Sequence, residues 1–62
     1  MTIGQNIKKY RKEKGLSQDE LANKSAISRQ LLNAFERGTR NPSAISLKSI
    51  ADELDINVDD LF

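Results

Sequence analysis

The sequence predicts a compact all-α domain of five short helices. Three observations indicate this fold class: apolar residues recur at helical spacing, each such segment follows a Ser, Thr or Asn that can cap a helix, and no segment alternates in the manner of a strand. The length of 62 residues suits one domain over residues 1–62, with a small core.

The first helix is expected to begin near Ile3. Thr2 and Gln5 have the T-x-x-Q spacing of a capping box, in which each side chain bonds the backbone N–H of the other residue. Ile3 and Ile7 would then share one face of the helix. Gly15 suits the left-handed position that ends many helices, so the helix should stop just before it.

The second helix is expected to follow another capping box, formed by Ser17 and Glu20. It would end near residue 24 or 25, and Leu21 and Ala22 would face inward. After a tight turn, a third helix should begin.

The third helix is expected to be capped by Ser28 and ended by Gly38. Leu32 and Phe35, three residues apart, would form its buried stripe. The remaining positions face the other way and carry mostly hydrogen-bonding side chains: Arg29, Gln30, Asn33, Ala34 and Arg37.

Two more helices are expected after the loop that contains Pro42. Ser43 would cap the fourth, and its apolar face would comprise Leu47, Ile50, Ala51 and Leu54. Asn57 would cap a short fifth helix over residues 58–62, where two Asp residues suit the positive end of the helix dipole.

Composition excludes several classes of protein. The chain has no Cys and no His, which excludes disulfides, thiolate zinc sites and nucleophile–histidine pairs. Its acidic pairs, Asp52–Glu53 and Asp59–Asp60, have no base, metal set or phosphate loop beside them, so we expect no enzyme, metal or cofactor. No membrane span or signal peptide is indicated, which makes the cytoplasm the expected compartment.

Charge is distributed unevenly, although the formal net charge is only +1. Residues 1–15 carry five basic side chains against one acidic, whereas residues 43–62 carry one basic against five acidic. This asymmetry suits a protein whose N-terminal part faces a polyanion. Solvated helix faces without any partner would show the same charges.

The chain resembles the phage-repressor type of helix-turn-helix domain, as in the lambda and 434 repressors, the Cro proteins and XRE-like regulators. The matching motifs run in order along nearly the whole chain and include Gly15-Leu16-Ser17-Gln18, Glu20-Leu21-Ala22, Ile27-Ser28, Glu36-Arg37-Gly38 and Asn41-Pro42-Ser43. The resemblance implies that residues 17–37 form the helix-turn-helix. It also implies that the third helix enters the major groove of double-stranded DNA.

The resemblance also implies roles for individual residues. Arg29 would donate to guanine O6 and N7, and Gln30 or Asn33 would pair with adenine. Ala34 would touch a thymine methyl group. Phosphate contacts are expected from residues around this helix, namely Gln18, Ser28, Arg37, Thr39, Arg40 and Asn41. Gln18 is a candidate for a second role, bracing a side chain of the third helix.

Two further sets are expected from the resemblance. Arg11 and Glu36 would form a structural ion pair between the first and third helices. An apolar patch on the face that relatives use for dimerisation would comprise Ile45, Val58 and Phe62. Single exposed apolar residues are common, so this patch is a hypothesis.

Residues 25 and 26 depart from the family pattern, because Ser25 and Ala26 stand where a large apolar residue and a glycine are usual. Either the turn avoids the left-handed region, or Ala26 adopts it at some cost. Leu31 is open to two interpretations: it covers the edge of the DNA groove or it packs against the second helix.

The function implied is a transcriptional repressor that acts in the nucleoid and binds a palindromic operator as a homodimer. The alternative is a protein-interaction module on the same fold, such as an antitoxin or a regulatory partner. Salt-sensitive binding to duplex DNA separates the two, because counterion release lowers the affinity for DNA steeply with salt.

Overall fold

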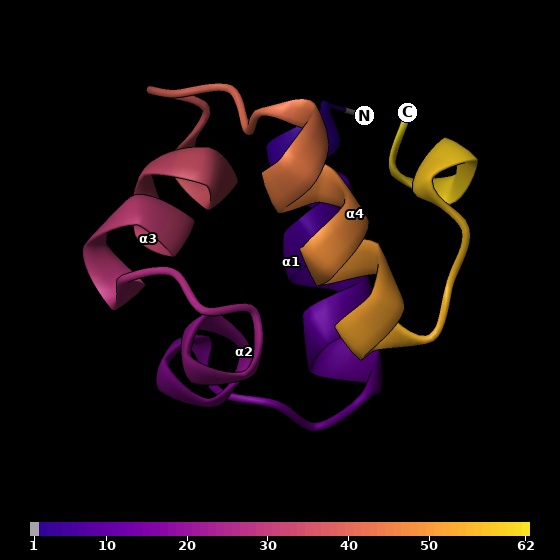
Figure 1. Ribbon diagram of the computed structural model, residues 1–62, viewed down its shortest axis with the longest axis horizontal. Helices are drawn as coiled ribbons and strands as arrows, with labels where there is room; N and C mark the ends of the chain where they lie inside the picture. The colour runs from indigo at the N-terminus through magenta and orange to yellow at the C-terminus, as the bar shows by residue number, and fades with distance from the viewer. Residues whose placement is uncertain (1) are drawn as a thin grey trace.

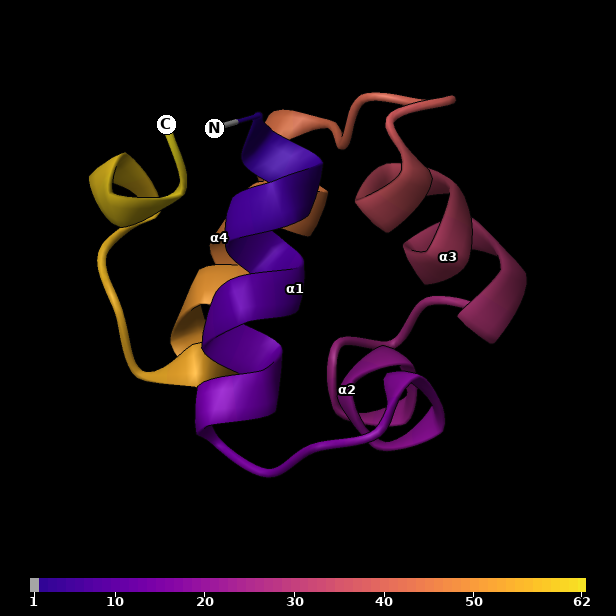
Figure 2. The same cartoon turned by 180° about the vertical axis from the view of Figure 1, so that it is seen from behind.

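Four α-helices and a final 3₁₀ turn make up the computed structural model, which describes residues 2–62 (Figures 1 and 2). Helices α1 and α4 lie side by side, α2 and α3 lie to one side of them, and η1 lies to the other. The elements are α1 Ile3–Glu13, α2 Gln18–Lys24, α3 Arg29–Arg37, α4 Ala44–Leu54 and η1 Val58–Leu61. No strand occurs among the described residues.

The α-helices begin where their predicted caps place them. Thr2 and Ser17 each belong to a complete capping box, and the hydroxyls of Ser28 and Ser43 each accept the N–H three residues further on. Gly38 ends α3 in the left-handed region, with φ 80°. Local capping therefore determines where α2 and α3 begin and where α3 ends.

The predicted fifth helix is wrong in type, because residues 58–61 form a single 3₁₀ turn. Four residues make too few i→i−4 bonds for an α-helix, and the tighter i→i+3 pattern is used in short pieces of this kind. The Asp60 carboxylate accepts the Asn57 N–H at 3.1 Å at the start of the turn. Leu61 is fully buried, and its carbonyl accepts a hydrogen bond from Asn6 of α1 at 2.9 Å.

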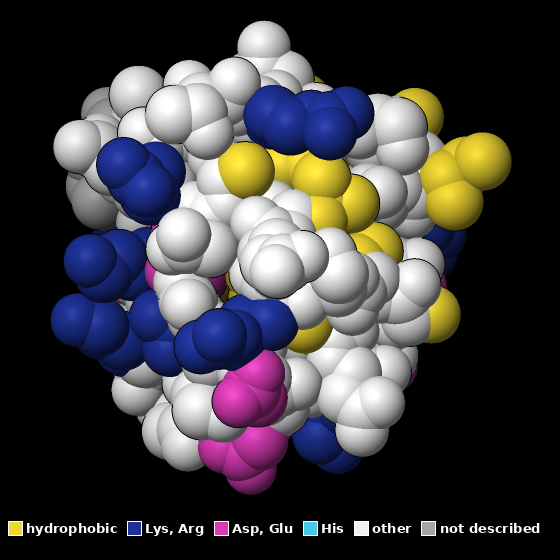
Figure 3. Space-filling model, turned by 90° about the vertical axis from the view of Figure 1, so that its left-hand side faces the viewer, with side chains coloured by type: hydrophobic (Ala, Val, Ile, Leu, Met, Phe, Trp, Pro, Cys, Tyr) yellow, Lys and Arg dark blue, Asp and Glu magenta, His cyan; other side chains and the backbone are white. Residues whose placement is uncertain are grey.

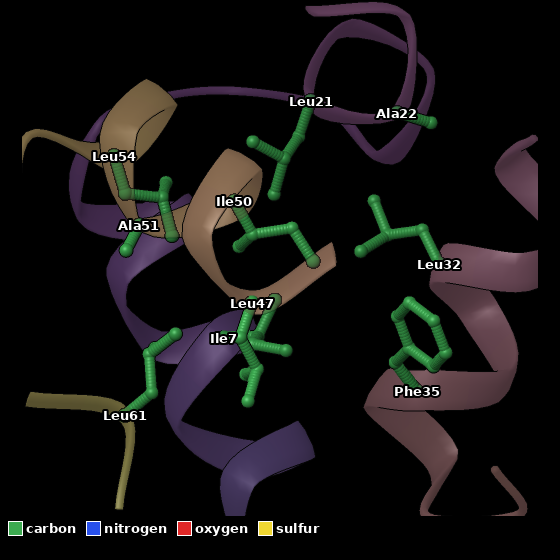
Figure 4. Packing of buried hydrophobic residues seen from close by; sticks show 10 residues of the cluster. All are labelled: Ile7, Leu21, Ala22, Leu32, Phe35, Leu47, Ile50, Ala51, Leu54 and Leu61. Atoms are coloured by element: carbon green, nitrogen blue, oxygen red, sulfur yellow. The ribbon is translucent and has the colours of Figure 1, made fainter. Parts of the chain in front are cut away.

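Every element contributes to one apolar core (Figure 4). The predicted inward residues of α2, α3 and α4 are all buried, and Ile27 packs partly buried against them. The largest fully buried side chains are Ile7, Leu21, Leu32, Ile50, Leu54 and Leu61. Because α3 contributes Leu32 and Phe35 to this core, the opposite side of α3 must face outward.

Helices α1 and α3 approach each other closely at Gly4. A Cβ atom at this position would overlap the backbone carbonyl of Phe35. Only glycine therefore permits the observed spacing of the two helices. This role of Gly4 was not predicted from the sequence, because its partner Phe35 lies on a helix distant along the chain.

The turn between α2 and α3 uses the left-handed region at Ala26, whose φ is 59°. Of the two alternatives for this turn, the structure adopts the one that an L-residue makes at some energetic cost. Ser25 beside it is 5% exposed, and its hydroxyl has no hydrogen-bond partner. These two residues make the turn the least favourable part of the helix-turn-helix.

Candidate nucleic-acid interface

The outer side of α3 brings the four predicted base-reading residues together. Arg29 and Gln30 are exposed, whereas Asn33 and Ala34 are half-buried. Leu32 and Phe35 point the opposite way into the core. The spacing of apolar and polar residues along α3 therefore gives one anchored side and one side that presents hydrogen-bonding groups.

Two hollows lie on this side of the molecule. One, of about 220 Å³, is lined by Gln18, Arg29, Gln30 and Asn33. The other, of about 360 Å³, is lined by Ser28, Gln30, Leu31, Ala34 and Arg40. Leu31 packs partly buried against the core and also lines the second hollow. Gln30 borders both hollows.

A buried ion pair fixes α3 against α1. Arg11 Nε and Nη2 donate to the two carboxylate oxygens of Glu36 at 2.7 and 3.1 Å, in the arrangement expected from the resemblance. Arg11 Nη1 also donates to the carbonyl of Leu16 at 2.8 Å. The two charged side chains are only 9% and 3% exposed. Such a pair is costly to break, because the remaining charge would stay buried without a partner.

Gln18 joins α2 to this ion pair. Its side-chain nitrogen donates to Glu36 Oε1 at 3.1 Å and to Asn33 Oδ1 at 3.2 Å. Gln18 therefore braces a side chain of α3, the second of the two roles considered for it. Both acceptors of the Gln18 amide therefore belong to α3.

An ion pair between Arg29 and Asp19 was not predicted from the sequence. Arg29 Nε lies 3.3 Å from Asp19 Oδ1, with the two side chains 62% and 75% exposed. The residues are on different helices, so no i,i+4 pattern in the sequence indicates the contact. The contact given by the structure joins Nε of the arginine to one carboxylate oxygen, and both side chains are open to solvent.

The predicted phosphate-contacting residues surround α3 on the surface. Arg37, Thr39, Arg40 and Asn41 are all exposed. Ser28 is exposed as well, and its hydroxyl accepts the Leu31 N–H at 3.0 Å while its own proton remains able to donate. Figure 3 shows Lys and Arg side chains spread across this face, with the largest acidic area in its lower part.

The residues of the expected dimer patch differ in exposure. Ile45 is 81% exposed and Phe62 is 70% exposed, whereas Val58 is half-buried against the core. The start of α4 and the C-terminus lie at the same end of the molecule (Figures 1 and 2). Only the two exposed side chains are fully available to a partner.

No group of three potential metal-binding side chains comes together among residues 2–62. None of the helices described is both long enough and apolar enough to cross a membrane.

The short α2, the turn through Ala26 and the outward polar side of α3 define a helix-turn-helix protein. The Helix-turn-helix family matches residues 7–61. The chain belongs to this family of transcriptional regulators.

Several relatives are close in sequence and structure. The HTH-type transcriptional regulator SinR of Bacillus subtilis (strain 168) is 46% identical over 57 residues, which cover 90% of this chain and 51% of SinR. The immunity repressor protein of Bacillus phage phi105 is 47% identical over 58 residues, covering 94% and 40% of the two chains. This chain therefore spans about half the length of SinR and less than half the length of the phage repressor.

A crystal structure of SinR, the master regulator for biofilm formation, in complex with DNA superposes with a TM-score of 0.93. Sequence identity to that chain is 44%, and the match covers 97% of each chain. The fold of this protein is therefore the same as that of a regulator seen bound to DNA.

Proposed function

We propose that the protein is a sequence-specific transcriptional repressor that binds double-stranded DNA with α3 in the major groove. The observation that carries this proposal is the outward side of α3. One arginine and two amides line a hollow there, and one of the amides also borders a second hollow. An α-helix fits the major groove, and arginine and amide side chains are the groups that distinguish bases there. The similarity to the DNA-bound regulator supports the same docking.

Base reading is assigned to the N-terminal half of α3. The exposed guanidinium of Arg29 suits the two acceptors of guanine, and Gln30 suits adenine. Ala34 and Leu31 give the second hollow an apolar part, which suits a thymine methyl group. Each good bidentate contact contributes about 1–3 kcal/mol of discrimination between bases.

Phosphate contacts are assigned to the exposed residues around α3. Arg37 and Arg40 supply charge, while Ser28, Thr39 and Asn41 supply hydrogen-bonding groups. Such contacts fix the register of a protein on DNA without reading its sequence. Gln18, whose side-chain nitrogen donates to Glu36 and Asn33, also supports the interface by holding α3.

The proposed repressor binds a palindromic operator as a homodimer. Exposed Ile45 and Phe62 supply the apolar surface for self-association. In this mode of docking, two recognition helices meet half-sites about 34 Å apart, one turn of the DNA. Occupancy of the operator would then exclude RNA polymerase.

Selection of bound duplexes from a random pool, combined with a salt titration, tests the proposal. We expect enrichment of an inverted repeat and a steep linear fall of log affinity with log salt. Absence of salt-sensitive binding to any duplex would contradict the proposal and favour the protein-interaction alternative.

A further inference from the structure

A chain of hydrogen bonds with a fixed direction begins at the buried carboxylate of Glu36. A carboxylate oxygen only accepts hydrogen bonds. Arg11 supplies two of the donors, at 2.7 and 3.1 Å, and Gln18 supplies the third at 3.1 Å. With the Glu36 side chain only 3% exposed, these protein donors take the place that water would otherwise fill.

The carboxylate determines which way the Gln18 amide faces. If this amide were turned over, its oxygen would meet a carboxylate oxygen, and two acceptors would face each other in a buried site. The amide nitrogen must therefore face Glu36, and its second hydrogen is directed to Asn33 Oδ1 at 3.2 Å. Gln18 is thus a donor to both of its neighbours.

The orientation of Gln18 in turn fixes the orientation of Asn33. Because Gln18 donates, the atom of Asn33 that faces it must be the oxygen. The amide nitrogen of Asn33, with its two hydrogens, is then the atom turned away from Gln18 in the hollow that Arg29 and Gln30 also line. Asn33 is half-buried, so this group remains accessible from outside.

This orientation does not suit adenine. A bidentate Asn–adenine pair requires the amide oxygen and the amide nitrogen to face the same base edge, so that one accepts from N6 and the other donates to N7. Guanine presents two neighbouring acceptors, O6 and N7, to which an amide NH₂ group can donate.

We infer that Asn33 reads guanine through its amide donor and that Glu36 and Gln18 set this preference without touching DNA. This inference rests on the proposed function. Pairing with adenine, which the sequence suggested for Gln30 or Asn33, is then assigned to Gln30 alone. Gln18 and Glu36 are positioning residues in this scheme, since they act through the orientation of Asn33.

Selection from a random duplex pool with the wild type, Asn33→Ala and Gln18→Met tests the inference. The operator position that loses its base preference in Asn33→Ala is the position that Asn33 reads. At that position the wild type should favour guanine over adenine by about fivefold or more, the ratio that corresponds to roughly 1 kcal/mol. Gln18→Met keeps the length of the side chain but removes both donors, so the ratio should fall towards one.

Gln30→Met is the matched control, because it removes an amide from the same surface that is not bonded to Glu36. It should alter a different base position and leave the guanine preference at the Asn33 position unchanged. If Gln18 served only to hold the fold, Gln18→Met would weaken binding to all sequences by the same factor. Far-UV circular dichroism and thermal unfolding establish that each variant is folded.

Asn33→Asp provides a second test that leaves Gln18 in place. An aspartate has only acceptor oxygens, so Gln18 can donate to one while the other faces the groove. The preference should then change from guanine to a base with an exocyclic amino group, adenine or cytosine.

Three results would overturn the inference while leaving the proposed function intact. The first is a preference for adenine at the position that Asn33 reads. The second is an unchanged ratio of guanine to adenine in folded Gln18→Met. The third is a selected sequence that is the same for Asn33→Ala as for the wild type. If the wild type enriches no sequence and binds no duplex in a salt-sensitive manner, the proposed function itself fails and this inference fails with it.

Discussion

Arg29 and Arg40 lie on the same surface but are assigned different roles, base reading for Arg29 and phosphate contact for Arg40. Arg29 opens α3 and lines the hollow with the two amides, whereas Arg40 lies in the loop after α3. Arg29 is also paired with Asp19, but an ion pair this exposed adds little to stability. Replacing Arg29 should therefore affect recognition more than folding.

We expect Arg29→Ala to relax the base preference at one operator position, at a cost of about 1–3 kcal/mol for the cognate site. Arg40→Ala should weaken binding to all sequences alike and reduce the slope of log affinity against log salt by about 1. Fluorescence anisotropy with cognate and scrambled duplexes at several salt concentrations measures both effects. Identical behaviour of the two variants would contradict the division between base reading and phosphate contact.

Ala26 is the residue whose backbone conformation is least suited to its side chain. At φ 59° an L-residue is strained by roughly 1–2 kcal/mol, whereas glycine is not. Glycine loses more chain entropy on folding, which offsets part of the gain. We expect Ala26→Gly to raise the free energy of unfolding by about 0.5–1 kcal/mol, measured by urea denaturation. Ala44→Gly, at a right-handed helical position, is the control and should not stabilise the protein.

At the scale of elements, the link between α1 and α3 holds α3 in place. It consists of the close approach at Gly4 and the buried pair of Arg11 with Glu36. We expect Arg11→Met to lower the free energy of unfolding by about 3–5 kcal/mol, because Glu36 would keep its charge in a buried site. Chemical denaturation measures this loss. Lys12→Met, at an exposed position of the same helix, should change stability by no more than about 0.5 kcal/mol.

The capping box of α2 makes the stability of that helix depend on pH. The backbone N–H of Ser17 lowers the pKa of Glu20 below its ordinary value, with a further contribution from the Ser17 hydroxyl. Because the folded pKa lies below the unfolded pKa, the stabilising contribution is complete above the unfolded value. It is lost as the pH falls through the folded value.

We expect Glu20→Gln to keep the capping box but to remove this part of the pH dependence. Glutamine at this position can still accept the Ser17 N–H, and it does not titrate. Urea denaturation of the two proteins between pH 3 and 7 should give curves that differ most near neutral pH and converge in acid. A stability difference that does not change with pH would contradict the role assigned to Glu20.

For the whole molecule, we expect assembly to depend on Ile45 and Phe62, the large apolar side chains that are exposed among residues 2–62. If they form the dimer surface, Ile45→Asp should shift sedimentation from dimer to monomer and weaken operator binding. Lys48→Gln changes the charge of α4 by the same amount and serves as the control. Unchanged assembly of Ile45→Asp, both free and bound to operator, would remove this surface from the proposal.

The boundaries of the helices and their buried sides follow from local patterns along the chain. Caps such as Ser17 and Ser28, and the spacing of Leu32 and Phe35, act over three or four neighbouring residues, so they can be recognised along the chain. The pairing of Arg11 with Glu36 was expected as well, although from the family resemblance and not from local pattern.

Contacts between side chains of different helices depend instead on the fold. The contact of Arg29 with Asp19 and the approach of α1 to α3 at Gly4 join segments that no local spacing relates. The direction of the hydrogen bonds from Gln18 to Asn33 depends on a carboxylate 18 residues away from Gln18, buried where only donors can satisfy it. Local patterns place groups on a surface, but the fold orients their donors and acceptors, because that orientation depends on neighbours distant in sequence.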